Sequence, residues 1–158
     1  MATNEELLRE TIRLSLANQE QGGGPFGAVV ARDGVIVAAS GNRVTAMGDP
    51  TAHAEVCAIR LACAELETFS LAGCVIYSSC EPCPMCLGAI YWARLDALYF
   101  AATRDDAAEA GFDDAFLYGE VVKRVSERVL PTMHVSDLRV EATDAFARWQ
   151  RELASTRY

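Results

Sequence analysis

Apolar side chains recur every four residues near the start of the chain, at Leu8, Ile12 and Leu16. Thr3 and Glu6, which precede them, have the spacing of a capping box, in which each side chain accepts a backbone N–H of the other residue. A four-residue apolar period on a polar background is typical of an amphipathic helix. We therefore expect a first helix that ends where the sequence becomes Gly-Gly-Gly-Pro.

The next apolar segments have the patterns of strands. Runs over 26–31 and 35–40 flank the sequence Arg-Asp-Gly, which favours a hairpin. Two further runs, 74–77 and 98–101, are continuously apolar, as expected of strands that are covered on both faces. A helix between these two runs would give a parallel β-α-β crossover. The four segments predict the greater part of a mixed sheet.

Helical spacing returns over 53–66 and from about Pro82 to residue 94. Beyond residue 105 the pattern is less regular and predicts four more elements, namely helices over 107–110, 116–124 and 144–153 and a last strand over 129–135. Strands that alternate with helices form layered α/β folds. We expect a three-layer α-β-α fold around a mixed five-stranded sheet, formed by a single domain over 1–158 because this length suits one core.

Composition and charge exclude several classes of partner. Hydrophobic residues make up 51% of the chain, so it can form a core. The 14 Lys and Arg against 22 Asp and Glu give a net charge of −8 without any basic cluster, which disfavours binding to nucleic acid. The first residues lack a charged leader with an apolar core, and no apolar run has membrane-spanning length. We expect a cytoplasmic protein that binds a small molecule, not nucleic acid or a membrane.

Residues that can bind a metal occur in two short motifs. The sequence Thr-Ala-His-Ala-Glu contains His53 and Glu55, and the sequence Cys-Glu-Pro-Cys-Pro-Met-Cys contains Cys83 and Cys86. One imidazole and two thiolates are a ligand set of catalytic zinc, which leaves the fourth position to water. The pattern H-x-E followed by P-C-x-x-C is the signature of zinc deaminases that act on bases. We expect His53, Cys83 and Cys86 to hold one Zn²⁺ ion.

The spacing within the motifs suits this chemistry. Cys83 and Cys86 share one face if a helix begins near Pro82, and the positive end of that helix favours the thiolates that zinc requires. His53 and Glu55 would point about 200° apart in a regular helix, at roughly 100° per residue. We therefore expect both in an irregular first turn, where Glu55 can move protons to a ring nitrogen and to the departing ammonia.

Other interpretations of the same residues remain open. The two cysteines alone would also fit a structural zinc clip in a non-enzymatic module that binds a partner, but a closed structural site needs a fourth ligand. Cys80 is the candidate for that ligand, although Pro82 separates it from the predicted helix. Asn42 follows a predicted strand and is either a turn residue or an amide that reads a base edge. The remaining thiols are expected to be reduced and buried, at Cys57, Cys63 and Cys74.

Several stretches resemble the bacterial guanine deaminases of the cytidine-deaminase-like superfamily. The stretches extend over nearly the whole chain and are 23–29, 49–55, 79–93 and 110–114. The metal motif is shared by the superfamily. The Gly-Phe-Asp-Asp sequence and the terminal Tyr158 restrict the resemblance to the guanine deaminase branch.

This resemblance implies a reaction and a metal centre. Guanine and water would give xanthine and ammonia, as in purine catabolism and salvage, with one zinc ion per subunit held by His53, Cys83 and Cys86. Glu55 would be the proton shuttle. Zinc-activated water would attack the ring carbon that bears the amino group.

The resemblance also implies residues that recognise the base. Phe26 would stack on it, Asn42 would hydrogen-bond to it, and Asp114 would assist recognition and proton transfer near the amine. Further residues would contribute to substrate binding, namely Ala54, Trp92 and Tyr158. Family members form homodimers in which the C-terminal segment crosses to the partner, so Tyr158 would close the other subunit's site.

Related substrates are alternatives. The guanosine deaminases of plants are similar in the metal motif and in Gly-Phe-Asp-Asp, and their pocket would have to admit a ribose. Adenosine deaminases of transfer RNA share Asp-Pro-Thr-Ala-His-Ala-Glu, but the charge of this chain disfavours that substrate. Cytosine and triazines are further alternatives.

Overall fold

The computed structural model describes residues 1–112 and 114–152, with only the backbone of Glu152. It divides into two compact units, Met1–Tyr118 and Gly119–Tyr158. The boundary falls within helix α6 (Ala115–Val122). Both metal motifs and all the strands of the described residues belong to the first unit. The prediction of a single domain is not tested by this division and stays a prediction.

The sheet of the first unit is mixed, as predicted. Its strand order is β2-β1-β3-β4, where β1 is antiparallel to β2 and β3, and β3 is parallel to β4. The strand bounds are Gly27–Arg32 (β1), Val35–Gly41 (β2), Val75–Cys80 (β3) and Ala97–Ala102 (β4). Asp33 and Gly34 form the tight turn of the predicted hairpin, with φ angles of 50° and 71°.

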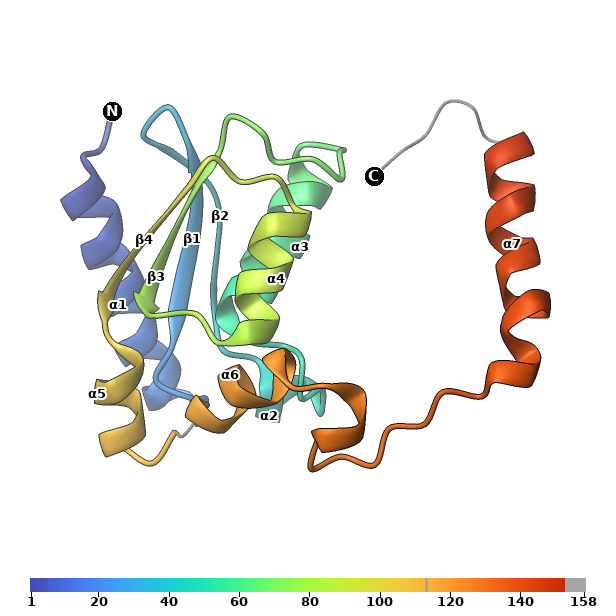
Figure 1. Cartoon of the computed structure of the whole chain (residues 1–158). Helices are drawn as coiled ribbons and strands as arrows, with labels where there is room; N and C mark the ends of the chain where they lie inside the picture. The colour runs from blue at the N-terminus through green and yellow to red at the C-terminus, as the bar shows by residue number, and fades with distance from the viewer. Residues whose placement is uncertain (113, 153–158) are drawn as a thin grey trace. The chain divides into compact units, whose positions relative to one another are not determined.

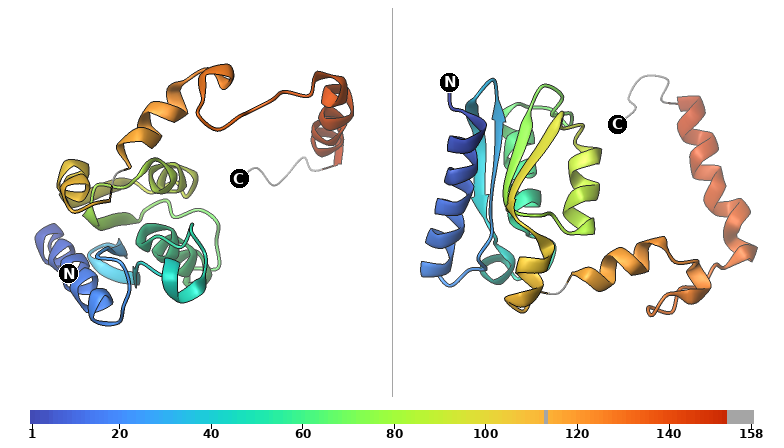
Figure 2. Two further views of the ribbon diagram at one scale, coloured as in Figure 1. Left: turned by 90° about the horizontal axis from the view of Figure 1, so that it is seen from below. Right: turned by 60° about the vertical axis from the view of Figure 1, so that its left-hand side comes forward.

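Helices cover both faces of this sheet (Figure 1). Helix α1 (Asn4–Glu20) packs on one face, while α3 (Ala54–Glu65) and α4 (Pro84–Trp92) pack on the other, as the second view in Figure 2 also shows. The largest apolar core lies between the sheet and the pair α3 and α4. Two short helices complete the unit, α2 (Val44–Met47) and α5 (Arg104–Glu109). The predicted three-layer α-β-α fold is confirmed.

Helix α1 has the predicted capping box but a different buried face. The Glu6 carboxylate accepts the Thr3 N–H at 2.8 Å, and the Thr3 hydroxyl accepts the Glu6 N–H at 3.2 Å. Leu16, at 57% exposure, lies outside the core, whereas Thr11 is fully buried. A Cβ atom at Gly27 of β1 would lie 2.4 Å from the Thr11 carbonyl oxygen, so helix and strand approach too closely there for large side chains. Small residues therefore lie where α1 contacts β1, namely Thr11 on the helix and Gly27 on the strand.

The predicted fifth strand over 129–135 is wrong. Within the described residues the sheet has four strands, and this segment is irregular and mostly exposed. Pro131 gives a physical reason, because proline lacks the N–H that a strand ladder requires and restricts the residue before it. Short 3-10 turns flank the segment, η1 (Val125–Glu127) and η2 (Ser136–Leu138).

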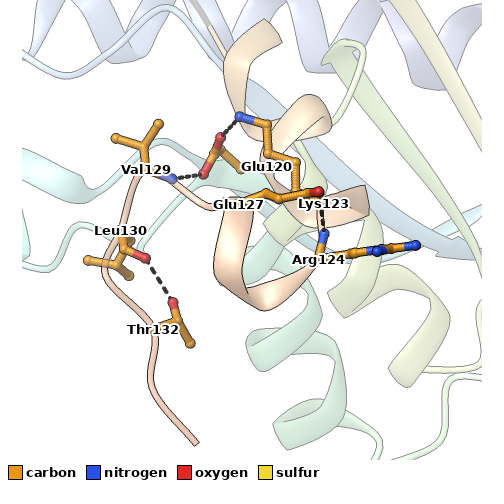
Figure 3. A network of polar contacts seen from close by, with 7 residues as sticks. All are labelled: Glu120, Lys123, Arg124, Glu127, Val129, Leu130 and Thr132. Carbon is orange, nitrogen blue, oxygen red and sulfur yellow. Dashed lines mark hydrogen bonds and ion pairs between the residues drawn. The ribbon is translucent and has the colours of Figure 1, made fainter.

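The second unit is organised by polar contacts and by one long helix. The Glu120 carboxylate accepts the Val129 N–H at 2.8 Å and pairs with Lys123 (Figure 3). These contacts hold the turn that follows α6. Helix α7 (Arg139–Glu152) begins five residues before the predicted start. No helix in the described part of the chain is both long and apolar enough to cross a membrane.

Candidate metal centre and active site

Two helices begin at the predicted metal ligands. His53 is the N-cap of α3, with an extended backbone (φ −64°, ψ 156°), and Cys83 is the N-cap of α4. Helix α4 therefore begins two residues later than predicted, with Pro84 in its first turn instead of Pro82. Glu55 lies in the first turn of α3, while His53 precedes the helix. The prediction of an irregular turn for both residues holds only for His53, whose non-helical backbone lets it share a cleft with Glu55.

The three ligand side chains meet at distances that suit zinc. His53 Nδ1 lies 3.7 Å from Cys83 Sγ and 3.5 Å from Cys86 Sγ, and the ligand atoms are all within 4.8 Å of one another. Ligands at about 2.1 and 2.3 Å from a tetrahedral zinc would be about 3.6 Å apart. The residues therefore fit the ion that the motif predicts.

Cys80 does not complete a closed site. Its thiol lies 3.5 Å from the Thr103 carbonyl oxygen, to which it donates, and it is not a member of the ligand group. Burial raises the pKa of Cys80 to about 11, so the group is a neutral thiol. A site with three protein ligands is typical of catalytic zinc, whereas structural sites have four.

Contacts among the three ligand residues shift their pKa values. The contact with the Cys86 side chain, aided by His53, lowers the pKa of Cys83 to about 4, although burial acts in the opposite direction. The same contact, together with burial and the neighbouring Glu55, raises the pKa of Cys86. The contact with Cys83 raises the pKa of His53. Cys83 is thus the thiol that ionises more readily, and metal binding has to displace the proton that the pair retains.

Glu55 lies beside the ligands in a buried position. Its Oε1 accepts the hydroxyl of Ser78 at 3.1 Å, and its Oε2 accepts the thiol of Cys86 at 3.4 Å. Burial raises the pKa of this carboxyl, which brings its proton affinity closer to neutrality. A carboxyl group in this state can both accept and return a proton.

Sequence reasoning missed Ser78. The predicted strand ended at Tyr77, whereas β3 continues to Cys80. Ile76 belongs to the core beneath α3 and α4, and Tyr77 belongs to the core beneath α1. Because strand residues alternate between faces, continuing the strand by one residue would have placed Ser78 on the side of Glu55.

A small cavity of about 30 Å³ adjoins the ligands. Besides His53, Glu55 and Cys83, its lining includes Glu81, which precedes Cys83 in the same connection, and side chains from three other segments, namely Phe26, Asn42 and Asp114. The structure thus brings together three of the residues that the resemblance assigned to the base. The Asp114 carboxylate is also close enough to contribute to the raised pKa of His53.

The other predicted substrate residues lie elsewhere. Ala54 is fully buried between His53 and Glu55. Trp92 lies at the last position of α4, is 64% exposed and has the Arg94 guanidinium 5.8 Å from its ring centroid. Neither is among the described residues that line the cavity. Tyr158 lies outside the described residues, so its role stays a prediction.

Neighbouring residues hold the cavity lining in place. The ring of Phe112 meets Phe26 edge to face, with centroids 5.0 Å apart. The Tyr118 hydroxyl donates to the Pro82 carbonyl at 2.6 Å, next to the ligand Cys83. Asn42 Oδ1 accepts the Val44 N–H at 3.1 Å, so Asn42 is both a turn residue and part of the cavity lining.

Comparison with known proteins agrees with this site. Residues 1–102 match the family described as cytidine and deoxycytidylate deaminase zinc-binding region. The chain is 50% identical over 148 residues to guanine deaminase of Bacillus subtilis (strain 168), a match that covers 93% of this chain and 94% of that protein. The X-ray structure of Bacillus subtilis guanine deaminase has a TM-score of 0.94 and 48% identity, with 99% of each chain covered.

Two other relatives match shorter parts. A tRNA-specific adenosine deaminase of Agrobacterium fabrum (strain C58 / ATCC 33970) is 45% identical over 89 residues, which are 55% of this chain and 59% of that protein. A mutant relative crystallised in complex with 8-azaguanine is 38% identical, has a TM-score of 0.70, and is matched over 72% of this chain and 66% of its own. The family match includes both metal motifs. The chain therefore belongs to the cytidine and deoxycytidylate deaminase family with this zinc-binding region.

Proposed function

We propose that this protein is a zinc-dependent guanine deaminase, which hydrolyses guanine to xanthine and ammonia. The observation that carries the proposal is similarity over almost the full length to Bacillus subtilis guanine deaminase, at 50% identity and a TM-score of 0.94. The match to a tRNA-specific adenosine deaminase covers 55% of the chain. Similarity thus continues beyond the zinc-binding region that these deaminases share, which favours guanine as the substrate.

The buried carboxyl of Glu55 is the proposed proton carrier. Zinc, when bound by His53, Cys83 and Cys86, supplies Lewis-acid activation of the attacking water. Glu55 accepts a proton from that water as the water oxygen bonds to the ring carbon that bears the amino group, and it delivers this proton to a ring nitrogen of guanine. It then takes the second proton from the added hydroxyl and gives it to the departing amino group. The carbon–nitrogen bond then breaks, and ammonia leaves. The Ser78 hydroxyl orients Glu55 throughout, because it donates to Oε1.

The opposite side of the cavity is the proposed base-recognition site. The Oδ1 atom of Asn42 accepts the Val44 N–H, so its NH₂ group is the end that can donate to a base carbonyl. The Phe26 ring offers an apolar face for stacking and is supported by Phe112. Asp114 offers an acceptor for N–H groups of the base. The resemblance also proposes Ala54, which lies between His53 and Glu55, and Trp92, which lies at the other end of α4 from Cys83 and outside the cavity lining.

Assembly is a second part of the proposal. We infer a homodimer with one zinc ion per subunit, in which the C-terminal segment of each chain reaches the other subunit's site through Tyr158. The resemblance to bacterial guanine deaminases supports this assembly. Deleting residues 156–158 is then expected to reduce kcat/KM strongly while the melting temperature changes little. Unchanged kinetics in the truncated protein would exclude a role for Tyr158.

The alternative substrates differ from guanine in size or charge. Guanosine requires room for a ribose, transfer RNA requires clustered basic residues, and the chain has a net charge of −8. Cytosine and triazines are single-ring alternatives for the same site. A zinc module without catalysis would not need a buried carboxyl beside its ligands, yet Glu55 is only 7% exposed.

The experiment that tests the function is release of ammonia by the zinc-loaded protein. Guanine, guanosine, adenosine and cytosine are compared under the same conditions, with xanthine identified by its absorbance. We expect kcat/KM to be highest for guanine. A preference for guanosine would keep the chemistry and change the substrate, whereas no deamination of any base would favour the binding-module alternative.

A further inference from the structure

A buried amide lies behind the proposed base-recognition residues. Asn18, near the end of α1, is 8% exposed. Its Nδ2 group donates to two backbone carbonyls, that of Gly24 at 2.7 Å and that of Asn42 at 2.9 Å. One side chain thus joins the end of α1, the loop that leads into Phe26, and the residue that follows β2.

The space around this amide fits asparagine closely. A Cβ atom at Gly23 would lie 2.3 Å from Asn18 Nδ2, and a Cβ atom at Gly41 would lie 2.5 Å from Asn18 Cγ. Glycine at both positions lets the two backbone segments approach the amide. Two carbonyl oxygens face the same atom, so the side chain must be a donor there. An aspartate would have the same size but would place a carboxylate against both carbonyls.

Backbone hydrogen bonds extend this contact to the cavity. The Asn42 N–H donates to the Phe26 carbonyl at 3.0 Å, and the Phe26 N–H donates to the Gly24 carbonyl at 2.9 Å. Together with the two bonds from Asn18, they form a closed set that fixes Phe26 and Asn42 relative to each other. Both side chains line the cavity, whereas Asn18 is not among its lining residues.

We propose that Asn18 is a positioning residue that sets the spacing between the stacking ring of Phe26 and the amide of Asn42. This proposal rests on the proposed function, in which both residues bind the base. Glu55 is held from a different element, by Ser78 of β3. Asn18 therefore acts on substrate binding and on selectivity among purines, and proton transfer is left largely intact.

The test replaces the donor without changing the size of the side chain. Asn18→Asp is expected to raise KM for guanine about 10-fold, because two buried carbonyls lose their donor, while kcat stays within about twofold. The inhibition constant of 8-azaguanine should rise by a similar factor. Zinc content should stay equal to that of the wild type.

Two further variants separate positioning from general destabilisation. Gly41→Ala adds a methyl group against Asn18 and should raise KM in the same way. Ser15→Ala is the matched control, because Ser15 is buried one turn earlier in α1 but donates only to the Ile12 carbonyl of its own helix. It should leave KM and kcat unchanged.

The possible failures can be distinguished. If Asn42→Ala raises KM for guanine but Asn18→Asp and Gly41→Ala do not, the positioning role is wrong and the proposed function stands. If both variants only lower the melting temperature, with unchanged KM, Asn18 is structural and the proposal is overturned. If the wild-type protein does not deaminate guanine, the proposed function itself fails.

Discussion

The metal-ligand side of the cavity and its base-recognition side are held in place by different parts of the fold. On the metal side, His53 and Cys83 are N-cap residues, so the helices α3 and α4 begin at the ligands themselves. On the recognition side, Phe26 and Asn42 lie in connecting segments. These segments are tied by Asn18, which is 24 residues from Asn42.

This difference separates chemistry from recognition. The metal side depends on a few residues with fixed local spacing, so a change there should remove activity altogether. The recognition side depends on several hydrogen bonds between distant segments, so a change there should lower the affinity for the substrate without abolishing activity. Substitutions on the metal side, on the recognition side and far from both can test this separation.

The largest effect is expected from removal of a ligand. Cys86→Ala should release zinc and reduce kcat/KM about 10⁴-fold or more, because water activation is lost. Zinc content is measured by atomic emission on the purified protein. Cys80→Ala is the control, since Cys80 only donates to the Thr103 carbonyl, and it should keep both zinc and activity. Loss of zinc from the Cys80→Ala variant would indicate that Cys80 is a zinc ligand.

Removal of the proton carrier should have the next largest effect. Glu55→Gln keeps the size of the side chain but cannot accept a proton, so kcat should fall about 10²- to 10⁴-fold. Zinc content and melting temperature should remain close to those of the wild type. Normal turnover by this variant would rule out the proposed mechanism.

A smaller effect is expected at the residue that orients Glu55. Ser78→Ala should lower kcat about 10-fold with little change in KM, because one hydrogen bond to the carboxylate is lost. Ser78→Thr keeps the hydroxyl and should restore most of the rate. In the Glu55→Gln background, the alanine change should have little further effect. An equal loss in both backgrounds would show that Ser78 acts independently of Glu55.

The smallest effect is expected far from the site. Thr3→Ala removes the side chain that accepts the Glu6 N–H at the start of α1 and should lower the melting temperature by roughly 2–4 °C. Both kcat and KM should be unchanged. A change in KM would mean that the start of α1 influences the recognition side through Asn18 at its end.

Most of the fold followed from local pattern. The apolar runs predicted the four strands, and the Asp33–Gly34 turn and the parallel crossover were correct. The errors arose where tertiary contacts determine which residues are buried and which segments pair as strands. Thr11 is buried because α1 approaches Gly27 closely, which apolar periodicity does not reveal. Pro131 was included in a strand whose hydrogen bonding it prevents.

The site was predictable to the extent that its residues are close in sequence. The three ligands and Glu55 occur in two short motifs, so their spacing alone indicated zinc chemistry. Contacts between distant residues were missed. Ser78 and Glu55 are 23 residues apart, and Tyr118 and Pro82 are 36 residues apart. Strand alternation gives the face on which Ser78 lies, but no local pattern in either segment specifies the partner.

The position of the ligands at two helix starts also links the supply of zinc to the stability of the folded chain. An ion held by His53 and Cys83 joins the first turn of α3 to the first turn of α4, so zinc acts as a cross-link within the layer formed by these helices. By mass action, each tenfold rise in free zinc above its dissociation constant adds about 1.4 kcal/mol to the free energy of unfolding. Zinc starvation would therefore reduce the amount of folded protein as well as its activity.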